Sequence, residues 1–376
     1  MNTQRTTGLL GPLMAPPQLP ARTGRIPAVD LARGIAVALM ILSHGVIGLL
    51  EFDDLSAWGQ IPVQLITKFA SSTFIMVFGI ALAVAFMPRV GTADWPRLRL
   101  KLWINALIVF FWYKVLTVAE MLYLSQPADI VDTLLYRNFP SFVEILGFYA
   151  IALLWVPLLL PLWVRLPLIV RLLSPVALAG LHMWAAANWS FGDNQQLRAI
   201  FVEDPDYYTW GQFARGPLIL LGLLIGEALL HHRETLMRRW RLASGLLVIS
   251  ALLFIAFVVQ AGSDLAADIE AVARNQGKHP PELFFMLFSM GGAFLILGLS
   301  IGGGKLLSKV LLPFTIIGSN ALQAFIFHIV VIFIGFRYLL GYWQDVEYEF
   351  ALMLTLGLIV ATAIWIRLVG WIQQHR

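Results

Sequence analysis

Three ionisable residues occur in one otherwise apolar segment near the start of the sequence. The segment 25–45 contains Asp30, Arg33 and His44, and most of its other positions are alanine, valine, leucine or isoleucine. Asp30 and Arg33 are about one helical turn apart, and Arg33 and His44 are about three turns apart. In a helix, the three side chains therefore lie on one face, with about 16 Å between Arg33 and His44 along the axis.

The residue types on this face suit two chemical tasks. Arg33 can bind an anionic ligand such as a phosphate while Asp30 holds the guanidinium group in place. His44 can act as a general base, because imidazole titrates near neutral pH. Structural roles fit the same pattern: an i,i+3 ion pair between Asp30 and Arg33, and a bond from His44 to a nearby carbonyl group. In a bilayer each of the three costs about 2.5–3.5 kcal/mol, so all require partners inside the protein.

The composition indicates a protein that lies mostly within a lipid bilayer. The chain has 376 residues, of which 59% are hydrophobic and only 13% charged, and its mean hydropathy is +0.79. A soluble domain carries about 25% charged residues. The sequence contains no cysteine, which excludes disulfides, thiolate metal sites and a cysteinyl acyl intermediate.

Ten apolar stretches approach the ~20 residues that a membrane-spanning helix requires. They cover residues 28–50, 61–87, 100–123, 141–163, 167–188, 212–230, 242–261, 282–301, 312–338 and 349–371. This pattern predicts an all-α polytopic bundle. The two longest stretches, 61–87 and 312–338, are expected to be tilted or broken, and Pro313, Gly318 and Asn320 favour a break in the second of these.

The charges of alternate loops predict the orientation of the chain. One set of loops and the end of the last span carry mostly cations: Arg89, Arg97, Arg99, Lys101, Arg165, Arg171, Arg233, Arg238, Arg239, Arg241, Lys305, Lys309, Arg367 and Arg376. The other set carries mostly carboxylates: Glu51, Asp53, Asp54, Asp129, Asp132, Asp193, Glu203, Asp204, Asp206, Asp264, Asp268, Glu270, Asp345, Glu347 and Glu349. By the positive-inside rule, both termini are cytoplasmic.

We therefore expect residues 1–24 to form a disordered cytoplasmic tail and residues 25–376 to form a single transmembrane domain. The basic loops also account for the net charge of +4, so this charge does not indicate a nucleic-acid partner.

Further polar residues within the spans mark a candidate cavity. Those that we expect to line a substrate path are Lys68, Glu144, Arg215 and Asn320. We also expect at least one ordinary buried ion pair between a lysine (Lys68 or Lys114) and a glutamate (Glu120 or Glu144). A metal site is not predicted, because the histidines show no i,i+4 spacing.

The loops that carry mostly carboxylates are longer than most of the loops that carry mostly cations. Residues 124–140, 188–211 and 262–281 are long enough to cover a cavity that opens on this side. The aromatic residues Trp189, Tyr207, Tyr208 and Trp210 fit an interfacial aromatic belt, with sugar stacking as the alternative.

The order Arg25, Asp30, Arg33-Gly34 and His44 resembles the first-helix signature of membrane-bound acyltransferases. These comprise the acyltransferase-3 family and the heparan-α-glucosaminide N-acetyltransferase-like proteins. Weaker similarities are Glu144-Ile-Leu, the segment 278–291, and the segment 317–328, which ends in His328. Val29, Ser43 and Glu282 depart from the pattern, and Ser43 leaves open both the branch and the acceptor.

The resemblance implies transfer of an acyl group, often acetyl, from cytosolic acyl-CoA to a hydroxyl or amine of a glycan or related acceptor at the outer face. Arg33 and Asp30 would then bind the donor, His44 would be the base with His328 as the next candidate, and Asn320, His328 or Arg215 would stabilise the oxyanion. Acyl-CoA is a co-substrate here, and no permanently bound cofactor is implied. The bacterial branch implies the inner membrane.

Two other functions compete with this reading. Buried charges also line the paths of transporters and of flippases for lipid-linked sugars, although the sequence shows no repeat of the kind that alternating access uses. A non-catalytic sensor or scaffold with the same fold is the third hypothesis. The motif Gly222-x-x-x-Gly226 is compatible with a homodimer and with a monomer.

The charge pattern makes a direct prediction about topology. A Ser190→Cys variant is expected to react with a membrane-impermeant thiol reagent added from outside, and a Thr235→Cys variant only after the cytoplasmic side is exposed. The native chain contains no cysteine, so each label reports one site. Labelling of Ser190→Cys from the cytoplasmic side alone contradicts the predicted orientation.

Overall fold

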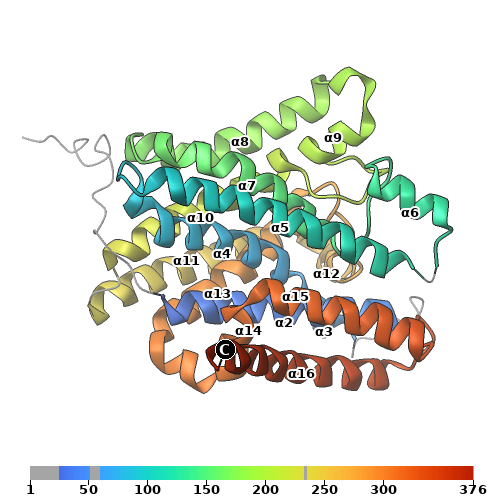
Figure 1. The fold of residues 1–376 in the computed structure, drawn as a ribbon. Helices are drawn as coiled ribbons and strands as arrows, with labels where there is room; N and C mark the ends of the chain where they lie inside the picture. Colours follow the sequence, from blue (N-terminus) through green and yellow to red (C-terminus); the bar gives the residue numbers. More distant parts are fainter. Residues whose placement is uncertain (1–24, 51–59, 123, 233–234, 376) are drawn as a thin grey trace, which may run out of the picture.

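The computed structural model describes residues 25–50, 60–122, 124–232 and 235–375. These residues are almost entirely helical, and the only β-structure among them consists of two isolated bridges, Leu50 with Val346 and Asp204 with Tyr207. The predicted tail, residues 1–24, lies outside the described part of the chain. The all-α bundle expected from the composition is confirmed (Figure 1).

Among the described residues, ten helical segments are long and apolar enough to cross a membrane. They are α2 (Pro27–Leu49), α3 (Ile61–Thr67) with α4 (Phe69–Phe86) and η2 (Met87–Arg89), α5 (Trp95–Met121), α7 (Glu144–Trp163), α8 (Leu168–Asn188), α10 (Gln212–His232), α11 (Leu236–Ala261), α13 (Leu283–Val310), α15 (Ala321–Val330) with η5 (Val331–Leu339), and α16 (Tyr348–Gln374). Shorter elements connect them: α6 (Pro127–Leu134), η3 (Phe191–Asp193), α9 (Gln195–Val202), η4 (Gly262–Asp264), α12 (Leu265–Ala273) and α14 (Leu312–Ser319).

Several spans extend further than their apolar stretches. Helix α5 begins at Trp95, α11 begins at Leu236, and α13 continues to Val310, so basic residues assigned to loops are part of helices. Long lysine and arginine side chains can reach the membrane surface from such positions while the backbone stays helical. The ninth span is broken at Asn320, between α14 and α15, as the sequence indicated.

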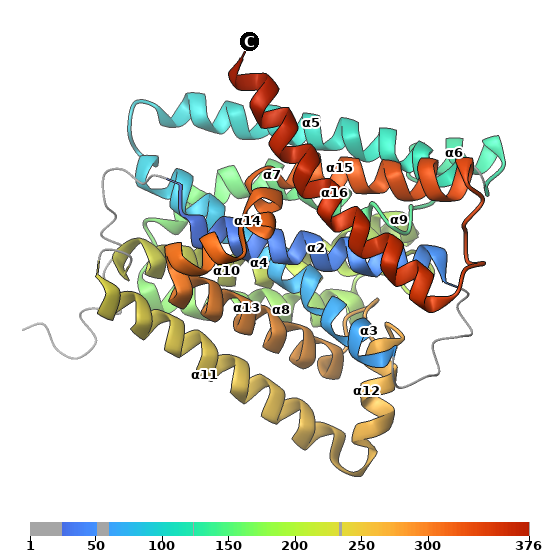
Figure 2. The ribbon, with the colours of Figure 1, turned by 90° about the horizontal axis from the view of Figure 1, so that it is seen from below.

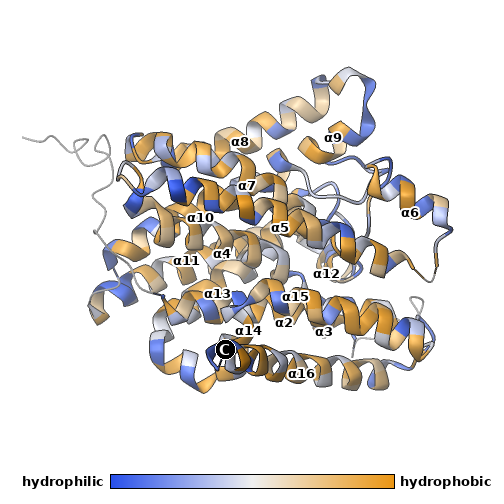
Figure 3. Cartoon of the chain, viewed as in Figure 1, coloured by the Kyte–Doolittle hydropathy of each residue, from blue (hydrophilic) through white to orange (hydrophobic). Residues whose placement is uncertain are grey.

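The helices differ in how far they are buried. The helices α2, α4, α7, α10 and α13 are mostly buried, whereas α5, α8, α11 and α16 expose most of their apolar side chains. Figure 2 shows α5 and α11 on opposite edges of the bundle, with α2 and α4 between them. Apolar residues run along most helices, and hydrophilic residues gather toward the ends and the connections (Figure 3). This arrangement suits a protein whose outward surface contacts lipid.

The two ends of the bundle carry the loops that the sequence separates by charge. We call the end with the connections 90–94, 164–167 and 311 and with the start of α11 the basic end, and the end with α6, α9 and α12 the acidic end (Figure 1). Helix α2 starts at the basic end, so Asp30 and Arg33 lie near that end and His44 lies in the opposite half.

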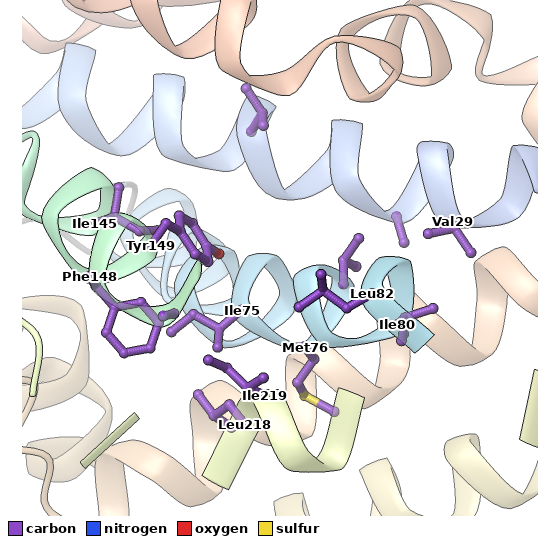
Figure 4. Packing of buried hydrophobic residues seen from close by; sticks show 14 of the residues in the cluster. Val29, Ile75, Met76, Ile80, Leu82, Ile145, Phe148, Tyr149, Leu218 and Ile219 are labelled. Atoms are coloured by element: carbon purple, nitrogen blue, oxygen red, sulfur yellow. The ribbon is translucent and has the colours of Figure 1, made fainter. Parts of the chain in front are cut away.

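The centre of the bundle is packed with apolar side chains from α4, α7 and α10. Figure 4 shows Ile75 and Met76 of α4 beside Leu218 and Ile219 of α10. These residues belong to one continuous buried cluster that also includes Val29 of α2. The rigid centre holds α2 and α7, the two helices that carry most of the candidate site.

Helices α2 and α14 approach each other closely at two glycines. A Cβ atom on Gly34 would lie 1.7 Å from the carbonyl oxygen of Phe314, and one on Gly318 would lie 1.8 Å from the carbonyl oxygen of Asp30. No side chain fits at such distances. The glycine that follows Arg33 therefore allows the backbone of α14 to contact α2 directly.

A methyl group at this crossing should separate the two helices. We expect Gly34→Ala to lower the free energy of unfolding by about 1–3 kcal/mol, as overpacking does, measured as thermal unfolding in detergent. Gly357→Ala on α16 is the control, since nothing lies within 4 Å of its added Cβ and alanine favours a helix over glycine. Equal unfolding temperatures for the two variants contradict the close crossing.

Candidate active site

His44 and His328 form a pair in the interior of the bundle. Nδ1 of His44 lies 3.2 Å from Nε2 of His328, although the two residues are 284 positions apart in the chain. The rings are stacked, with an interplanar angle of 28°, and the edges of Phe142 and Phe325 hold the His44 ring in place. The structure thus brings together the two histidines that the sequence singled out.

The hydrogen bonds define which ring nitrogens carry protons. Nδ1 of His328 lies 3.0 Å from the carbonyl oxygen of Ala324, which can only accept, so this nitrogen donates. Nε2 of neutral His328 is then an acceptor, and Nδ1 of His44 must donate to it. Nε2 of His44 therefore keeps its lone pair and makes no hydrogen bond with the described residues. This is the arrangement of a base oriented by a second group.

A small cavity lies beside His44 toward the acidic end. It has about 40 Å³ of space for water, enough for a few molecules. Ser43 and His44 of α2, Lys68 and Glu144 line it. Residues of the long acidic-end loops complete the lining: Trp210, Asn275 and Lys278. The loops 188–211 and 262–281 therefore cover this cavity, which we call the outer cavity.

Trp210 contributes to the site rather than to the membrane surface. Its indole N–H donates to Oε1 of Glu144 over 3.0 Å, and the ring is buried. Trp189, in contrast, is exposed. The aromatic residues of this loop thus have different environments, and only Trp210 lines the cavity beside His44.

A second, larger cavity lies on the other side of the histidine pair. It has about 390 Å³ of space for water and is lined by Arg33, Asn105, Tyr149 and apolar residues, including Phe325. A neighbouring cavity shares Asn105 with it and extends to Phe86, at the end of α4 nearest the basic end. We call the two together the inner cavity. Tyr149 brings a buried hydroxyl group that has no hydrogen-bond partner among the described residues.

Phe325 and α7 separate the two cavities. Phe325 lines the inner cavity and contacts both histidine rings. On α7, Ile145 lines the outer cavity and the next residue, Leu146, lines the inner one. The histidine pair therefore lies at the boundary between a cavity that reaches toward the basic end and one below the acidic-end loops.

Arg33 and Asp30 connect α2 to the end of α14. Nη1 of Arg33 donates to Oδ1 of Asp30 over 3.0 Å and to the carbonyl oxygen of Gly318 over 2.9 Å. Arg25 donates to Oδ2 of Asp30 and to the carbonyl oxygen of Ser319. The last carbonyl groups of a helix have no partner within it and attract cations. Nε and Nη2 of Arg33 make no hydrogen bond with the described residues, so this side chain combines a structural contact with free donors at the inner cavity.

Arg215 lies in a buried ionic cluster and is not among the residues that line either cavity. Nε of Arg215 donates to Oε1 of Glu203 over 2.8 Å, and Nη2 donates to the carbonyl oxygen of Lys278. Nδ1 of His279 lies 2.9 Å from Oε2 of Glu203. The cluster ties the start of α10 to the two loops that cover the outer cavity. Asn320 forms the break between α14 and α15 and also does not line either cavity.

The cluster fixes the charges of its members. Burial raises the pKa of Glu203, but Arg215 and His279 outweigh burial and bring this pKa from 4.5 to about 2. Burial lowers the pKa of His279 from 6.5 to about 4, although Glu203 raises it in part. At neutral pH, Glu203 is thus ionised and His279 is neutral. Within the cluster, the positive charge of Arg215 therefore balances the negative charge of Glu203.

The expected lysine–glutamate pair within the membrane is absent from the described residues. The carboxylate of Glu120 instead accepts from the backbone N–H groups of Ser141 and Phe142, because the turn before α7 leaves these donors without other partners. Lys114 lies 3.6 Å from the centre of the Tyr136 ring. The ammonium group of Lys68 is buried without a hydrogen-bond partner.

Comparison with known protein families shows to which family the chain belongs. Residues 26–369 match the family model described as an acyltransferase domain, that of the acyltransferase-3 family. The chain belongs to the acyltransferase-3 family. A comparison with curated proteins finds no match. The family resemblance expected from the first helix is confirmed, and the protein is a membrane-embedded acyltransferase. The hypotheses of a transporter and of a non-catalytic scaffold gain no support.

Some residues of this acyltransferase site were not indicated by the sequence. Glu203 stands in an acidic loop segment, Glu-Asp-Pro-Asp, that resembles a solvated surface, yet only 2% of its surface is exposed. Its backbone φ of +66° is rare for a residue with a side chain. Lys278 begins the segment 278–291, whose similarity to the family gives the lysine no role. No local pattern marks either residue, because both depend on contacts between distant loops.

Removal of the Glu203 charge should destabilise the acyltransferase, because Arg215, with 1% of its surface exposed, would remain buried without a counter-charge. We expect Glu203→Gln to cost about 3–5 kcal/mol in the free energy of unfolding. Glu270→Gln is the control: it breaks the ion pair with Arg274, in which the glutamate side chain is 48% exposed, at a cost of about 0.5 kcal/mol or less.

The pH dependence of thermal unfolding gives an independent check. The pKa of Glu203 is lower in the folded protein than its ordinary 4.5, so its stabilising effect is complete above pH 4.5 and is lost as the pH falls toward 2. His279 resists protonation in the folded protein, so stability also falls between pH 6.5 and about 4. Glu203→Gln should lack the lower-pH loss, and an identical acid profile for the variant contradicts the role of this pair.

Proposed function

We propose that the protein transfers an acyl group from cytosolic acyl-CoA to a hydroxyl or amine of a glycan or related acceptor on the opposite face of the membrane. The observation that supports this most is the position of the His44–His328 pair between two cavities. The inner cavity contains Arg33 and leads toward the basic end, which the positive-inside rule assigns to the cytoplasm. His44 lines the outer cavity, and its Nε2 atom, on the ring opposite the contact with His328, makes no hydrogen bond with the described residues.

The donor fits the inner cavity by charge and by shape. The free guanidinium nitrogens of Arg33 offer charge-assisted hydrogen bonds to a phosphate or carbonyl oxygen. The walls beyond it are mostly apolar, and Asn105 and the unpartnered hydroxyl group of Tyr149 provide polar contacts. A pantetheine arm combines methylene groups with amides, and this lining suits such an arm. An acetyl group is the simplest acyl group that this arm would carry to the histidine pair.

His44 is suited to remove the proton from the acceptor. As the acceptor oxygen or nitrogen attacks the thioester carbonyl carbon, Nε2 of His44 takes its proton. The positive charge then formed on His44 is shared with His328 through the 3.2 Å contact of the two rings. When the tetrahedral intermediate collapses, the carbon–sulfur bond breaks and the proton passes from His44 to the departing thiolate. The new ester or amide leaves through the outer cavity.

The proposed donor and acceptor indicate the membrane in which the protein lies. Acyl-CoA on the basic side and a glycan on the acidic side suit the inner membrane of a bacterium, where the chain contacts lipid along its exposed helices. His328 acts through His44 in this scheme and is a positioning residue. Asp30 holds the Arg33 guanidinium group and takes no part in the chemistry.

Two substitutions should separate donor binding from catalysis. We expect Arg33→Ala to weaken binding of a non-hydrolysable acetyl-CoA analogue by roughly tenfold or more, since a hydrogen bond to a charged group contributes about 1.5–3 kcal/mol. His44→Gln should bind the analogue normally and lose about 10²–10⁴-fold in transfer rate, measured as labelled acetyl groups passed from acetyl-CoA to envelope material.

The controls address folding. Arg25 still neutralises Asp30 in Arg33→Ala, so its unfolding temperature should stay near that of the wild type. Arg33→Lys should restore binding only in part, because an ammonium group lacks the fork of the guanidinium group. A transfer rate near that of the wild type in His44→Gln would place the base elsewhere, and unchanged analogue binding in a folded Arg33→Ala would leave Arg33 with a structural role alone.

A further inference from the structure

The outer cavity contains more cationic groups than carboxylates. Lys68 lines it with only 3% of its surface exposed, and its Nζ atom has no hydrogen-bond partner among the described residues. Lys278 approaches from the loop above, where its Nζ atom donates to the hydroxyl group of Tyr208 over 2.7 Å. Glu144 is the single carboxylate among the lining residues. The lining thus contains two ammonium groups for one carboxylate.

Glu144 does not neutralise Lys68 through a direct contact. Its Oε1 atom accepts from Trp210, and its Oε2 atom is buried without a hydrogen-bond partner in the described part of the chain. Burial lowers the pKa of Lys278, and Glu144 raises it only in part. An ammonium group held away from water without a partner costs several kcal/mol. Such an amine either gives up its proton or binds an anion, and a bound anion removes the cost while the ammonium group keeps its charge.

The backbone holds Lys68 at the cavity. Lys68 stands between α3 and α4, and its carbonyl group accepts from the hydroxyl group of Ser289 over 2.6 Å. Ser289 also bonds the hydroxyl group of Ser72 over 2.7 Å. These buried contacts from α13 fix the junction of the two helices. The position of the lysine is therefore built into the bundle and does not depend on a flexible surface loop.

We propose that Lys68, together with Lys278, binds an anionic group of the acceptor, a carboxylate or a phosphate, next to the hydroxyl or amine that His44 deprotonates. This rests on the proposed function and narrows its acceptor to acidic glycans or phosphorylated sugars. The hydroxyl groups of Ser43 and Ser71, which also line the cavity, add hydrogen bonds to the anion. Trp210 offers a ring face against which a sugar can stack.

Charge-selective labelling tests the sign of the potential in the cavity without any acyl transfer. A Ser71→Cys variant is treated with methanethiosulfonates of similar size, one anionic (sulfonatoethyl) and one cationic (trimethylammonium-ethyl). We expect the ratio of anionic to cationic rates to exceed that of Ser190→Cys, on an outer loop, by roughly tenfold or more. Adding Lys68→Met to Ser71→Cys should lower the ratio toward that of Ser190→Cys.

Two results overturn the proposal. Equal ratios at the two sites show that the cavity has no excess positive charge. A cysteine at position 71 that reacts with neither reagent shows that the cavity is closed to an acceptor entering from this side. Because labelling does not depend on donor or catalysis, either result leaves the test of His44 and Arg33 unaffected, and loss of the proposed base would not alter the labelling ratio.

Simple sugars identify the anion. At equal ionic strength, glucuronate or glucose 6-phosphate should raise the unfolding temperature of the protein in detergent more than glucose does. Lys68→Met should lose this difference, Lys68→Arg should keep most of it, and Lys305→Met, at the basic end, should not affect it. A response to glucuronate alone assigns a carboxylate, and a response to glucose 6-phosphate alone assigns a phosphate. No advantage of either anion over glucose rejects anion binding as the role of Lys68.

Discussion

The need to pair charged groups away from water determines much of this structure. Within a bilayer no solvent satisfies a buried charge or an open helix end. Asp30 therefore joins Arg25 and Arg33, Glu227 joins Arg171 between α10 and α8, and Glu203 joins Arg215 at the acidic end. The pair of Glu227 with Arg171 joins two separate helices, whereas the pairs of Asp30 and Glu203 involve residues that are close in the sequence. Among the buried polar atoms that lack a hydrogen-bond partner in the described residues, those of Lys68, Glu144 and Tyr149 belong to residues that line the two cavities. A substrate can provide there what the protein does not.

The histidine pair is held by hydrogen bonds rather than by opposite charges, and its members form a chain of donors and acceptors. Ala324 fixes the proton on His328, His328 fixes the proton on His44, and the last nitrogen in the chain remains a base. The assignment follows from the carbonyl group of Ala324, which cannot donate, and from a neutral His328 ring. A backbone atom of α15 thus determines the chemistry of a side chain on α2, which explains how a lone histidine in a membrane helix can be held ready for proton transfer.

The sequence predicted the features that depend on local pattern. Apolar stretches located the spans, and Asp30, Arg33 and His44 identified one face of the first helix. Asn320 and its neighbours indicated the break in the ninth span. Pairings between elements were not predictable in this way, since helical periodicity shows which residues share a face but not which helix that face meets. The expected lysine–glutamate pair was therefore wrong, as Glu120 meets backbone donors of a turn. Glu203 went unnoticed because its burial depends on two loops folding over one another.

The break at Asn320 explains how one helix provides two different contacts to α2. Since α14 ends at Ser319, the carbonyl groups of Gly318 and Ser319 are open to arginines, whereas in a continuous helix they would bond the next turn. Beyond the break, α15 presents His328 to His44. The two contacts are eleven residues apart on α2, from Arg33 to His44, and ten residues apart on the partner, from Gly318 to His328. On α2 the spacing corresponds to about 16 Å along one helix, whereas on the partner it includes the non-helical residue Asn320. The glycines at the crossing bring the backbones close enough for the first contact, and α15, which follows the break, makes the second. The distance between the arginine and the base is set by α2 alone, and the break in the partner lets one segment of the chain contact both residues.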